Sequence, residues 1–289
     1  YLAKTNQTLQ DQAKDKFGSS VVVIPVVHDK IQLFTPPTAE GGLPLTDFPK
    51  LHCPFIRQTF DIDPGEWKKY GKPLGLREPK AYLAVNQINP GYEWVFDDPD
   101  TIAVEKLHGT NVKIRVESGR ITAIQNRKNV VDPLMAAKGQ PFLMEALFIS
   151  AGRGLIPTDG TFAGEVIGPK LQSNPYKLDV HEWFPFDKSV TELRYKSFDE
   201  HERTYDNLSS WFKDHLHSRL FLKRARKQGS EEKVFAEGVV FYNLRRKAEQ
   251  KTWMAKLRRD MFPWFYEPIQ IKDFTVSGRE QVEDQNQFD

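Results

Sequence analysis

The segment Thr101–Asn111 constrains this chain most, because a run of β-forming residues carries a lysine into a turn of small residues. Thr101–Val104 favour a strand, and Lys106 stands at its end, three residues before Gly109. A lysine near a glycine can meet a phosphate without a neighbouring side chain in the way. Such an amine becomes a nucleophile when burial or nearby cations lower its pKa from about 10.4. The alternative is a solvated lysine at a turn, so this segment alone does not decide the function.

Five later segments complete an ordered pattern that begins at Lys106. They are Asn126–Asn129, Phe162–Pro169 continuing through Leu171 and Gln172, Trp183–Asp187, Ala236–Phe241 and Trp253–Arg258. With the segment at Lys106, they resemble the motifs of the covalent nucleotidyltransferases, the superfamily of DNA ligases, RNA ligases and mRNA capping enzymes. In that superfamily the lysine of the first motif takes up a nucleoside monophosphate. One such match would be a weak signal, whereas six matches in order argue against coincidence.

The form of the first motif favours RNA ligases. DNA ligases and capping enzymes usually carry aspartate two residues after the lysine and arginine five after it, whereas this chain has His108 and Asn111. That form is similar to the RNA ligase 2 family of T-even phage and kinetoplastid editing ligases. Arg258 departs from the family, which has a second lysine there. The resemblance implies an α+β fold, with antiparallel sheets in an ATP-grasp-like nucleotidyltransferase domain and the nucleotide between the sheets.

The resemblance also implies roles for individual residues. Lys106 would be the catalytic nucleophile, with ATP as the nucleotide and Mg²⁺ or Mn²⁺ as the metal. Glu165 would contact the sugar and Phe186 the base, with Phe184 as its competitor; the plain alternatives are a surface carboxylate and a core phenylalanine. Glu237 would orient the metal through a water, and Glu165 is a weaker metal candidate. The expected nucleotide-binding residues are Glu105, His108, Gly109, Asn111, Arg127, Glu165, Phe186, Glu237, Lys256 and Arg258.

Phosphoryl chemistry explains why these residue types are needed. Attack by the lysine on an α-phosphate expels pyrophosphate, whose charge must be neutralised by cations. Lys256 and Arg258 can both reach phosphate oxygens on one face of a strand if Leu257 points to the other face. Glu237 precedes the apolar run Val239–Phe241, which would hold it rigidly. His108 is expected to hydrogen-bond in the turn, because the other six histidines form no set at metal-ligand spacing.

The net charge of +2 conceals a basic region. Residues 219–259 contain 13 Lys or Arg and four Glu, a net charge of +9. A charged run is most often a solvated face, but these clusters flank the last two motifs, where a nucleic-acid backbone would enter the site. We therefore expect an RNA backbone to contact Lys223, Arg224, Arg226, Lys227, Arg245, Arg246 and Lys247.

The 289 residues allow one large domain or two. We expect a small β-rich module over residues 1–92, a nucleotidyltransferase domain over 93–272 and an acidic tail over 273–289. The module resembles the oligonucleotide-binding barrels that precede some RNA ligases, or it is an extension of the catalytic domain with strands near 54–56 and 82–85. A hairpin over 111–124, a buried helix over 142–151 and an apolar stripe at helical spacing from 208 to 216 are also predicted, and His215 and His217 are expected to lie in a helix.

The leading functional prediction is an RNA ligase that joins 5′-phosphate and 3′-hydroxyl ends, with nicked duplexes or tRNA-like ends as candidate substrates. The alternatives are a DNA ligase, a capping enzyme and a nucleic-acid-binding relative without catalysis. A single cysteine, Cys53, excludes an intrachain disulfide framework and suits a reducing compartment. We expect a monomer in the cytoplasm, or in the host cytoplasm if the source is viral. No apolar stretch approaches the length of a membrane helix.

Overall fold

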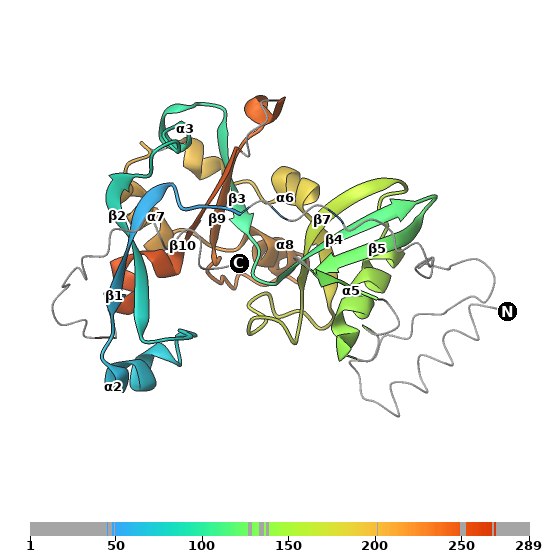
Figure 1. Ribbon diagram of the computed structural model, residues 1–289, viewed down its shortest axis with the longest axis horizontal. Helices are drawn as coiled ribbons and strands as arrows, with labels where there is room; N and C mark the ends of the chain where they lie inside the picture. The colour runs from blue at the N-terminus through green and yellow to red at the C-terminus, as the bar shows by residue number, and fades with distance from the viewer. Residues whose placement is uncertain are drawn as a thin grey trace. The chain divides into compact units, whose positions relative to one another are not determined.

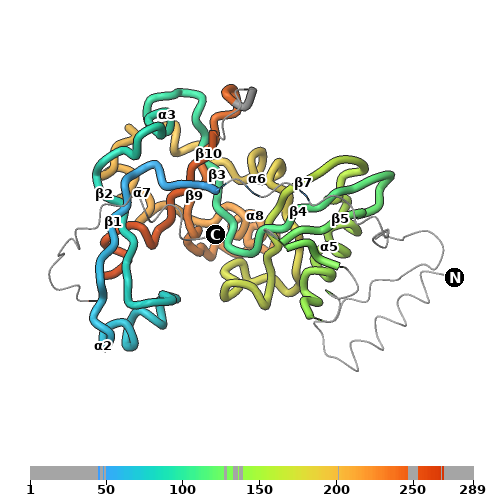
Figure 2. The backbone as a smooth tube through the Cα atoms, viewed as in Figure 1, coloured from blue at the N-terminus to red at the C-terminus, as the bar shows by residue number. Residues whose placement is uncertain are grey.

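Contacts within the chain divide it into two compact units (Figures 1 and 2). The first unit comprises Tyr1–Phe48 and Leu107–Glu192, and the second comprises Pro49–Lys106 and Leu193–Asp289. The computed structural model describes residues 45, 48, 50–126, 129–132, 136, 139–200, 202–248, 253–267 and 269. The predicted acidic tail and nearly all of residues 1–49 lie outside the described residues, so the predicted N-terminal module and the domain boundaries stay predictions.

The first unit is built on a five-stranded antiparallel sheet in the order β6-β5-β4-β7-β8. Its elements are β4 (Thr110–Glu117), β5 (Arg120–Asn126), β6 (Asn129–Val130), α5 (Pro141–Gly152), β7 (Gly160–Ile167), β8 (Glu182–Pro185) and α6 (Phe186–Glu192). Ser118 and Gly119 join β4 to β5 with φ values of 52° and 73°. Positive φ at both turn residues is the geometry that matches strand twist in a two-residue hairpin. The predicted hairpin and the buried helix α5 are confirmed.

Alternate residues of this sheet form the core of the first unit. Val112, Ile114 and Val116 point to the same side as Trp183 and pack with Leu143 and Leu147 of α5. The Trp183 ring is fully buried, and its Nε1–H donates to the carbonyl oxygen of Val112 at 3.0 Å. The period of two along β4 therefore directs its odd-numbered residues, beginning with Asn111, to the opposite face of the sheet.

The second unit contains a two-stranded sheet and a three-stranded sheet in the order β10-β9-β3. Its strands are β1 (Phe55–Asp61), β2 (Lys80–Ile88), β3 (Thr101–Lys106), β9 (Gly238–Asn243) and β10 (Met254–Arg258). Its main helices are α7 (Tyr205–Asp214) and α8 (Arg219–Lys227). Short helical segments are α2 (Pro64–Glu66), η1 (Trp67–Gly71), α3 (Trp94–Asp97), η2 (Lys196–Asp199), η3 (Arg245–Ala248), η4 (Arg259–Met261) and η5 (Pro263–Tyr266).

The core of the second unit lies between one face of the three-stranded sheet and α7. Val239, Phe241 and Leu257 pack in one cluster with Trp211 and Phe212. Phe55 of β1 and Ala84 of β2 belong to the same cluster, so the strands near 54–56 and 82–85 share a core with the segments that carry the later motifs. The predicted α+β class with antiparallel sheets is confirmed. Among the described residues, no helix has the length and apolar character needed to cross a membrane.

One local prediction was wrong. The helix expected to include His215 and His217 ends at Asp214, and His215 is its C-terminal cap. His217 instead pairs with Phe235 in an isolated β-bridge. Leu216 is still fully buried, although it lies after the end of the helix. The apolar spacing therefore predicted its burial correctly but not its backbone conformation. Burial of that leucine does not require helical backbone.

Candidate active site

Lys106 is the last residue of β3, and its amine is held by a carboxylate from the neighbouring strand segment. Lys106 Nζ lies 2.7 Å from Oε2 of Glu237, the residue before β9. The side chains of Lys106 and Glu237 are 24% and 14% exposed, so the pair is largely buried but still in contact with solvent. The sequence placed both residues in the site, and the structure brings them into direct contact.

Strand pairing places further cations on the same sheet face as Lys106. Gly238 pairs with Lys106 on one side and with Arg258 on the other. Directly paired residues in antiparallel strands share a face, and so do residues two apart, so Lys256 lies on that face as well. Leu257 points to the opposite face and is fully buried. The predicted alternation of Lys256, Leu257 and Arg258 is therefore present.

Lys256 occupies a strongly cationic environment. Burial is the largest cause that lowers its pKa to about 8. The positive charges of Arg258, Lys106 and Arg57 act in the same direction, and the charge of Glu237 opposes them. The backbone N–H of Lys256 donates to the carbonyl oxygen of His52 at 2.9 Å. An ammonium in such surroundings is stabilised by an anion, which makes this sheet face suited to phosphate.

The titration of Lys256 gives a testable pH dependence. The ammonium is charged below about pH 8 and neutral above it, so affinity for a triphosphate should fall about tenfold as pH rises through this range. Lys256→Arg keeps its charge and should move the loss of affinity to higher pH. The measurement is the ATP concentration that half-saturates covalent labelling of the protein between about pH 7 and about pH 9.5. Identical pH profiles for the two proteins would contradict the role of Lys256.

Asp260 adds a second carboxylate close to Glu237. Burial raises the pKa of the Asp260 carboxyl, and the charge of Glu237 acts in the same direction. Arg258 Nε forms an ion pair of 3.0 Å with Asp260 Oδ1. Among the described residues, no group of three or more His, Cys, Asp or Glu could hold a metal. A site for Mg²⁺ through one or two carboxylates and phosphate oxygens does not need such a group, and Glu237 with Asp260 nearby fits that donor set.

Sequence reasoning missed Asp260, Arg57 and His52. Asp260 lies two residues after the end of the last motif, so its position near Arg258 was available as a signal. Arg57 and His52 precede Lys106 by about 50 residues, and only the pairing of residues 52–57 with β10 and β2 brings them into this region. No feature of the local sequence indicated that placement.

The first unit contains a row of polar and aromatic residues across its sheet. Asn111 pairs with Glu165, and Glu165 pairs with Phe184, so the three side chains share one face. The Asn111 amide donates to the Glu165 carboxylate. Phe186 lies outside this row, because it begins α6. Its side chain is half-buried. The structure thus groups Phe184, the competitor in the sequence reasoning, with two residues predicted to bind nucleotide.

The turn after Lys106 is fixed within the first unit. The backbone N–H of His108 donates to the hydroxyl of Tyr176 at 2.7 Å. A side chain at Gly109 would place its Cβ only 2.1 Å from the carbonyl oxygen of Val166, so only glycine fits there. Gly109 therefore allows the backbone of this turn to approach the backbone of β7 closely. Arg127, the remaining nucleotide-binding candidate of this part of the chain, lies outside the described residues.

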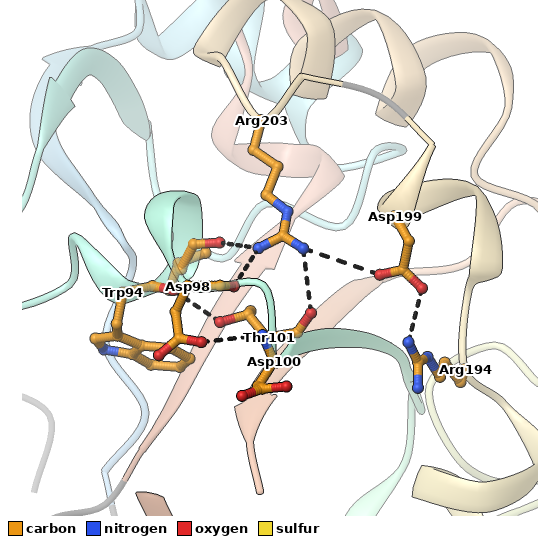
Figure 3. A network of polar contacts seen from close by, with 8 residues as sticks. Trp94, Asp98, Asp100, Thr101, Arg194, Asp199 and Arg203 are labelled. Carbon is orange, nitrogen blue, oxygen red and sulfur yellow. Dashed lines mark hydrogen bonds and ion pairs between the residues drawn. The ribbon is translucent and has the colours of Figure 1, made fainter. Parts of the chain in front are cut away.

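An arginine holds the beginning of β3. The Arg203 guanidinium donates to the carbonyl oxygens of Asp98 at 2.7 Å, Val95 at 3.3 Å and Thr101 at 3.4 Å (Figure 3). The Thr101 hydroxyl also donates to the carbonyl oxygen of Trp94 at 2.7 Å. Three backbone acceptors for one guanidinium hold the chain where the strand starts, five residues before Lys106.

The two basic clusters differ in their surroundings. On α8, the side chains of Lys223, Arg226 and Lys227 are exposed, and that of Arg224 is half-buried. Arg245 and Arg246 form ion pairs of 2.9 Å with Asp100 and Asp98. The Lys247 side chain lies outside the described residues. Lys223, Arg226 and Lys227 thus present exposed positive charge on one helix, which is suited to a phosphate backbone.

Comparisons with known proteins found remote structural matches. No protein-family model matches the chain, and no curated protein matches its sequence. A Naegleria gruberi RNA ligase variant with ATP and Mn is 15% identical with a TM-score of 0.30, and the ligase with PPi is 17% identical with a TM-score of 0.30; each match covers 55% of this chain and 49% of the ligase. A further variant with ATP and Mn is 12% identical with a TM-score of 0.33, covering 76% and 63%. This chain thus spans less than two thirds of each ligase.

Proposed function

We propose that this chain is an ATP-dependent RNA ligase that joins 5′-phosphate and 3′-hydroxyl ends through AMP bound covalently to Lys106. The observation that carries the proposal is the end of β3, where an amine is held by Glu237 with Lys256 and Arg258 on the same sheet face. A nucleophilic amine beside clustered cations is what attack on a polyphosphate requires. The six ordered motifs support the same assignment.

Three displacements at phosphorus would make up the reaction. The deprotonated Lys106 amine attacks the α-phosphorus of ATP, a nitrogen–phosphorus bond forms and pyrophosphate leaves. A 5′-phosphate of RNA then attacks the same phosphorus, the lysine amine leaves, and an adenylylated 5′ end results. A 3′-hydroxyl finally attacks the 5′-phosphorus of that end and AMP leaves. Each step transfers a phosphoryl group without any redox change, so positioned charges can supply most of the catalysis.

Glu237 has two tasks in this scheme. It would hold Mg²⁺ or Mn²⁺ together with phosphate oxygens, and the cation would supply neutralisation of the triphosphate charge. Its carboxylate binds the Lys106 ammonium in the free protein, and an ammonium has no electron pair with which to attack. Glu237 must therefore release Lys106, and the amine must lose a proton, before the nitrogen–phosphorus bond can form.

The remaining site residues would bind the rest of the nucleotide and the RNA. Asn111 and Glu165 would hold the sugar, and the base would stack on Phe184 or on Phe186. The exposed cations of α8 would contact the RNA backbone, with the residues at 245–247 as a second contact region.

A labelling experiment without nucleic acid tests the proposal. The protein is incubated separately with radiolabelled ATP, GTP and NAD and with Mg²⁺ or Mn²⁺, and the adduct is located by peptide mapping. We expect one AMP per chain on the peptide that contains Lys106, and sealing of a nicked RNA duplex by the labelled protein. A GMP adduct from GTP would indicate a capping enzyme instead. An adduct on another residue, or none, would refute the proposed function.

A further inference from the structure

Glu105, the residue before the nucleophile, carries a buried carboxylate that binds the N-terminus of a helix. Its side chain is 2% exposed. Oε1 accepts from the Ser218 hydroxyl at 2.5 Å, and Oε2 accepts from the backbone N–H of Leu220 at 2.9 Å. Ser218 is the N-terminal cap of α8, and its hydroxyl oxygen also accepts from the N–H of Phe221 at 3.1 Å. The carboxylate therefore extends the cap of α8 and meets the positive end of its dipole.

The sequence grouped Glu105 with the nucleotide-binding residues, but its side chain points away from the face of Lys106. Glu105 pairs with Val239, and Val239 pairs with Leu257, both fully buried in the core. Lys106 pairs with Gly238 on the opposite face. The backbone N–H of Glu105 donates to the carbonyl oxygen of Leu193 at 3.0 Å. Both oxygens of the carboxylate and the backbone N–H thus fix the strand at the residue next to the nucleophile.

Burying a carboxylate has a desolvation cost, which hydrogen bonds to its oxygens offset in part. Burial raises the pKa of Glu105 to about 7, and the hydrogen bonds from Ser218 and Leu220 oppose that rise. An apolar residue at this position would extend the core of Val239 and Leu257 without the desolvation cost. What the carboxylate adds is a fixed distance between the end of β3 and α8, which an apolar contact does not define.

We propose that Glu105 is a positioning residue for Lys106, because its contacts with Ser218 and Leu220 fix the C-terminal end of β3 to the N-terminus of α8. This inference rests on the proposed function, since the geometry matters through the attack of Lys106 on a phosphate. A small displacement of a nucleophile from its line of attack can cost about a hundredfold in rate. Arg203 fixes the start of β3 in a comparable way, so the strand is held at both ends.

The test separates positioning from general stability. Single-turnover formation of the Lys106–AMP adduct is measured for the wild-type protein, Glu105→Gln, Glu105→Ala and Ser218→Ala. Three quantities are recorded: the maximal rate constant, the ATP concentration at half-maximal rate, and the fraction of protein that reacts. Thr204→Ala is the matched control, because the Thr204 side chain caps α7 in the same unit by accepting from the N–H of Asn207 at 3.3 Å and, among the described residues, makes no hydrogen bond to β3.

Glu105→Ala should lower the maximal rate constant about tenfold to a hundredfold with little change in the half-saturating ATP concentration. Ser218→Ala should lower it about threefold to tenfold, because the helix N–H groups still bind the carboxylate. Glu105→Gln should lie between the wild-type protein and Glu105→Ala, since its amide oxygen can accept from only one of the two donors. Thr204→Ala should lower the unfolding temperature as Ser218→Ala does and leave the rate constant unchanged.

Several results would overturn the inference. Adduct formation by Glu105→Ala at the wild-type rate constant would do so, as would an equal loss of rate constant in Thr204→Ala and Ser218→Ala. If Glu105→Ala does not fold, the comparison of Ser218→Ala with Thr204→Ala decides. A smaller reacting fraction with an unchanged rate constant would show a purely structural role. If the wild-type protein forms no adduct, the proposed function itself fails; if it does, these variants judge the positioning role alone.

Discussion

Replacing Lys106 by arginine should abolish covalent nucleotide labelling, with a loss of at least about a thousandfold in rate. Arginine keeps a positive charge and can still pair with Glu237, whose carboxylate lies 2.7 Å from the lysine amine. Its guanidinium stays protonated at any accessible pH and offers no electron pair to phosphorus. The substitution therefore removes the proposed nucleophile while it preserves the positive charge of the site. It is a more specific test than Lys106→Ala, which removes both.

Intact-mass measurement after incubation with ATP and a divalent cation provides the readout. Lys213→Arg is the matched control, because Lys213 also forms an ion pair, with Glu267 at 2.9 Å, in the same unit. The control should label at the wild-type rate. An AMP adduct that persists in Lys106→Arg would place the nucleophile elsewhere and remove the basis of the proposed mechanism.

The sequence predicts best where local periodicity decides the structure. The alternation of polar and apolar residues in β4 gave both the hairpin and the face that carries Asn111. The same rule gave β10, where the buried Leu257 separates two cations that share a face. In both strands, successive side chains point to opposite faces of the sheet, and the face with the apolar residues packs against the core.

Prediction was weaker where the partner of a residue lies far along the chain. Glu105 binds Ser218, 113 residues away, and no local pattern marks that contact. Ser218 itself could have been recognised as a helix cap before an amphipathic basic run, since serine is favoured at that position. The choice between Phe184 and Phe186 also depends on tertiary pairing, because only the register of β7 with β8 places Phe184 beside Glu165. Two aromatic residues two positions apart look equivalent in the sequence.

Gly238→Ala should be among the most damaging small substitutions in the second unit, because strand register brings two backbones close together at Gly238. Gly238 lies between Lys106 and Arg258 on the pairing strands. A Cβ atom there would lie 2.2 Å from the carbonyl oxygen of Leu257 and 2.7 Å from Cα of Arg258. Both are backbone atoms, so relief requires β9 and β10 to separate. We expect a loss of about 3 kcal/mol in the free energy of unfolding, together with loss of adduct formation.

Gly152→Ala is the control for this substitution, because a Cβ at Gly152 meets no atom within 4 Å. Gly152 ends helix α5, where alanine is the better helix former, so the control should be neutral or slightly stabilising. Urea unfolding of both variants gives the change in free energy, and the adduct assay gives the change in activity. If Gly238→Ala unfolds at the wild-type midpoint, the close approach of β9 and β10 is not what fixes Arg258 opposite Lys106. Retained stability with lost labelling would instead show that the added methyl group blocks the phosphate-binding face directly, because Gly238 lies on that face between the two cations.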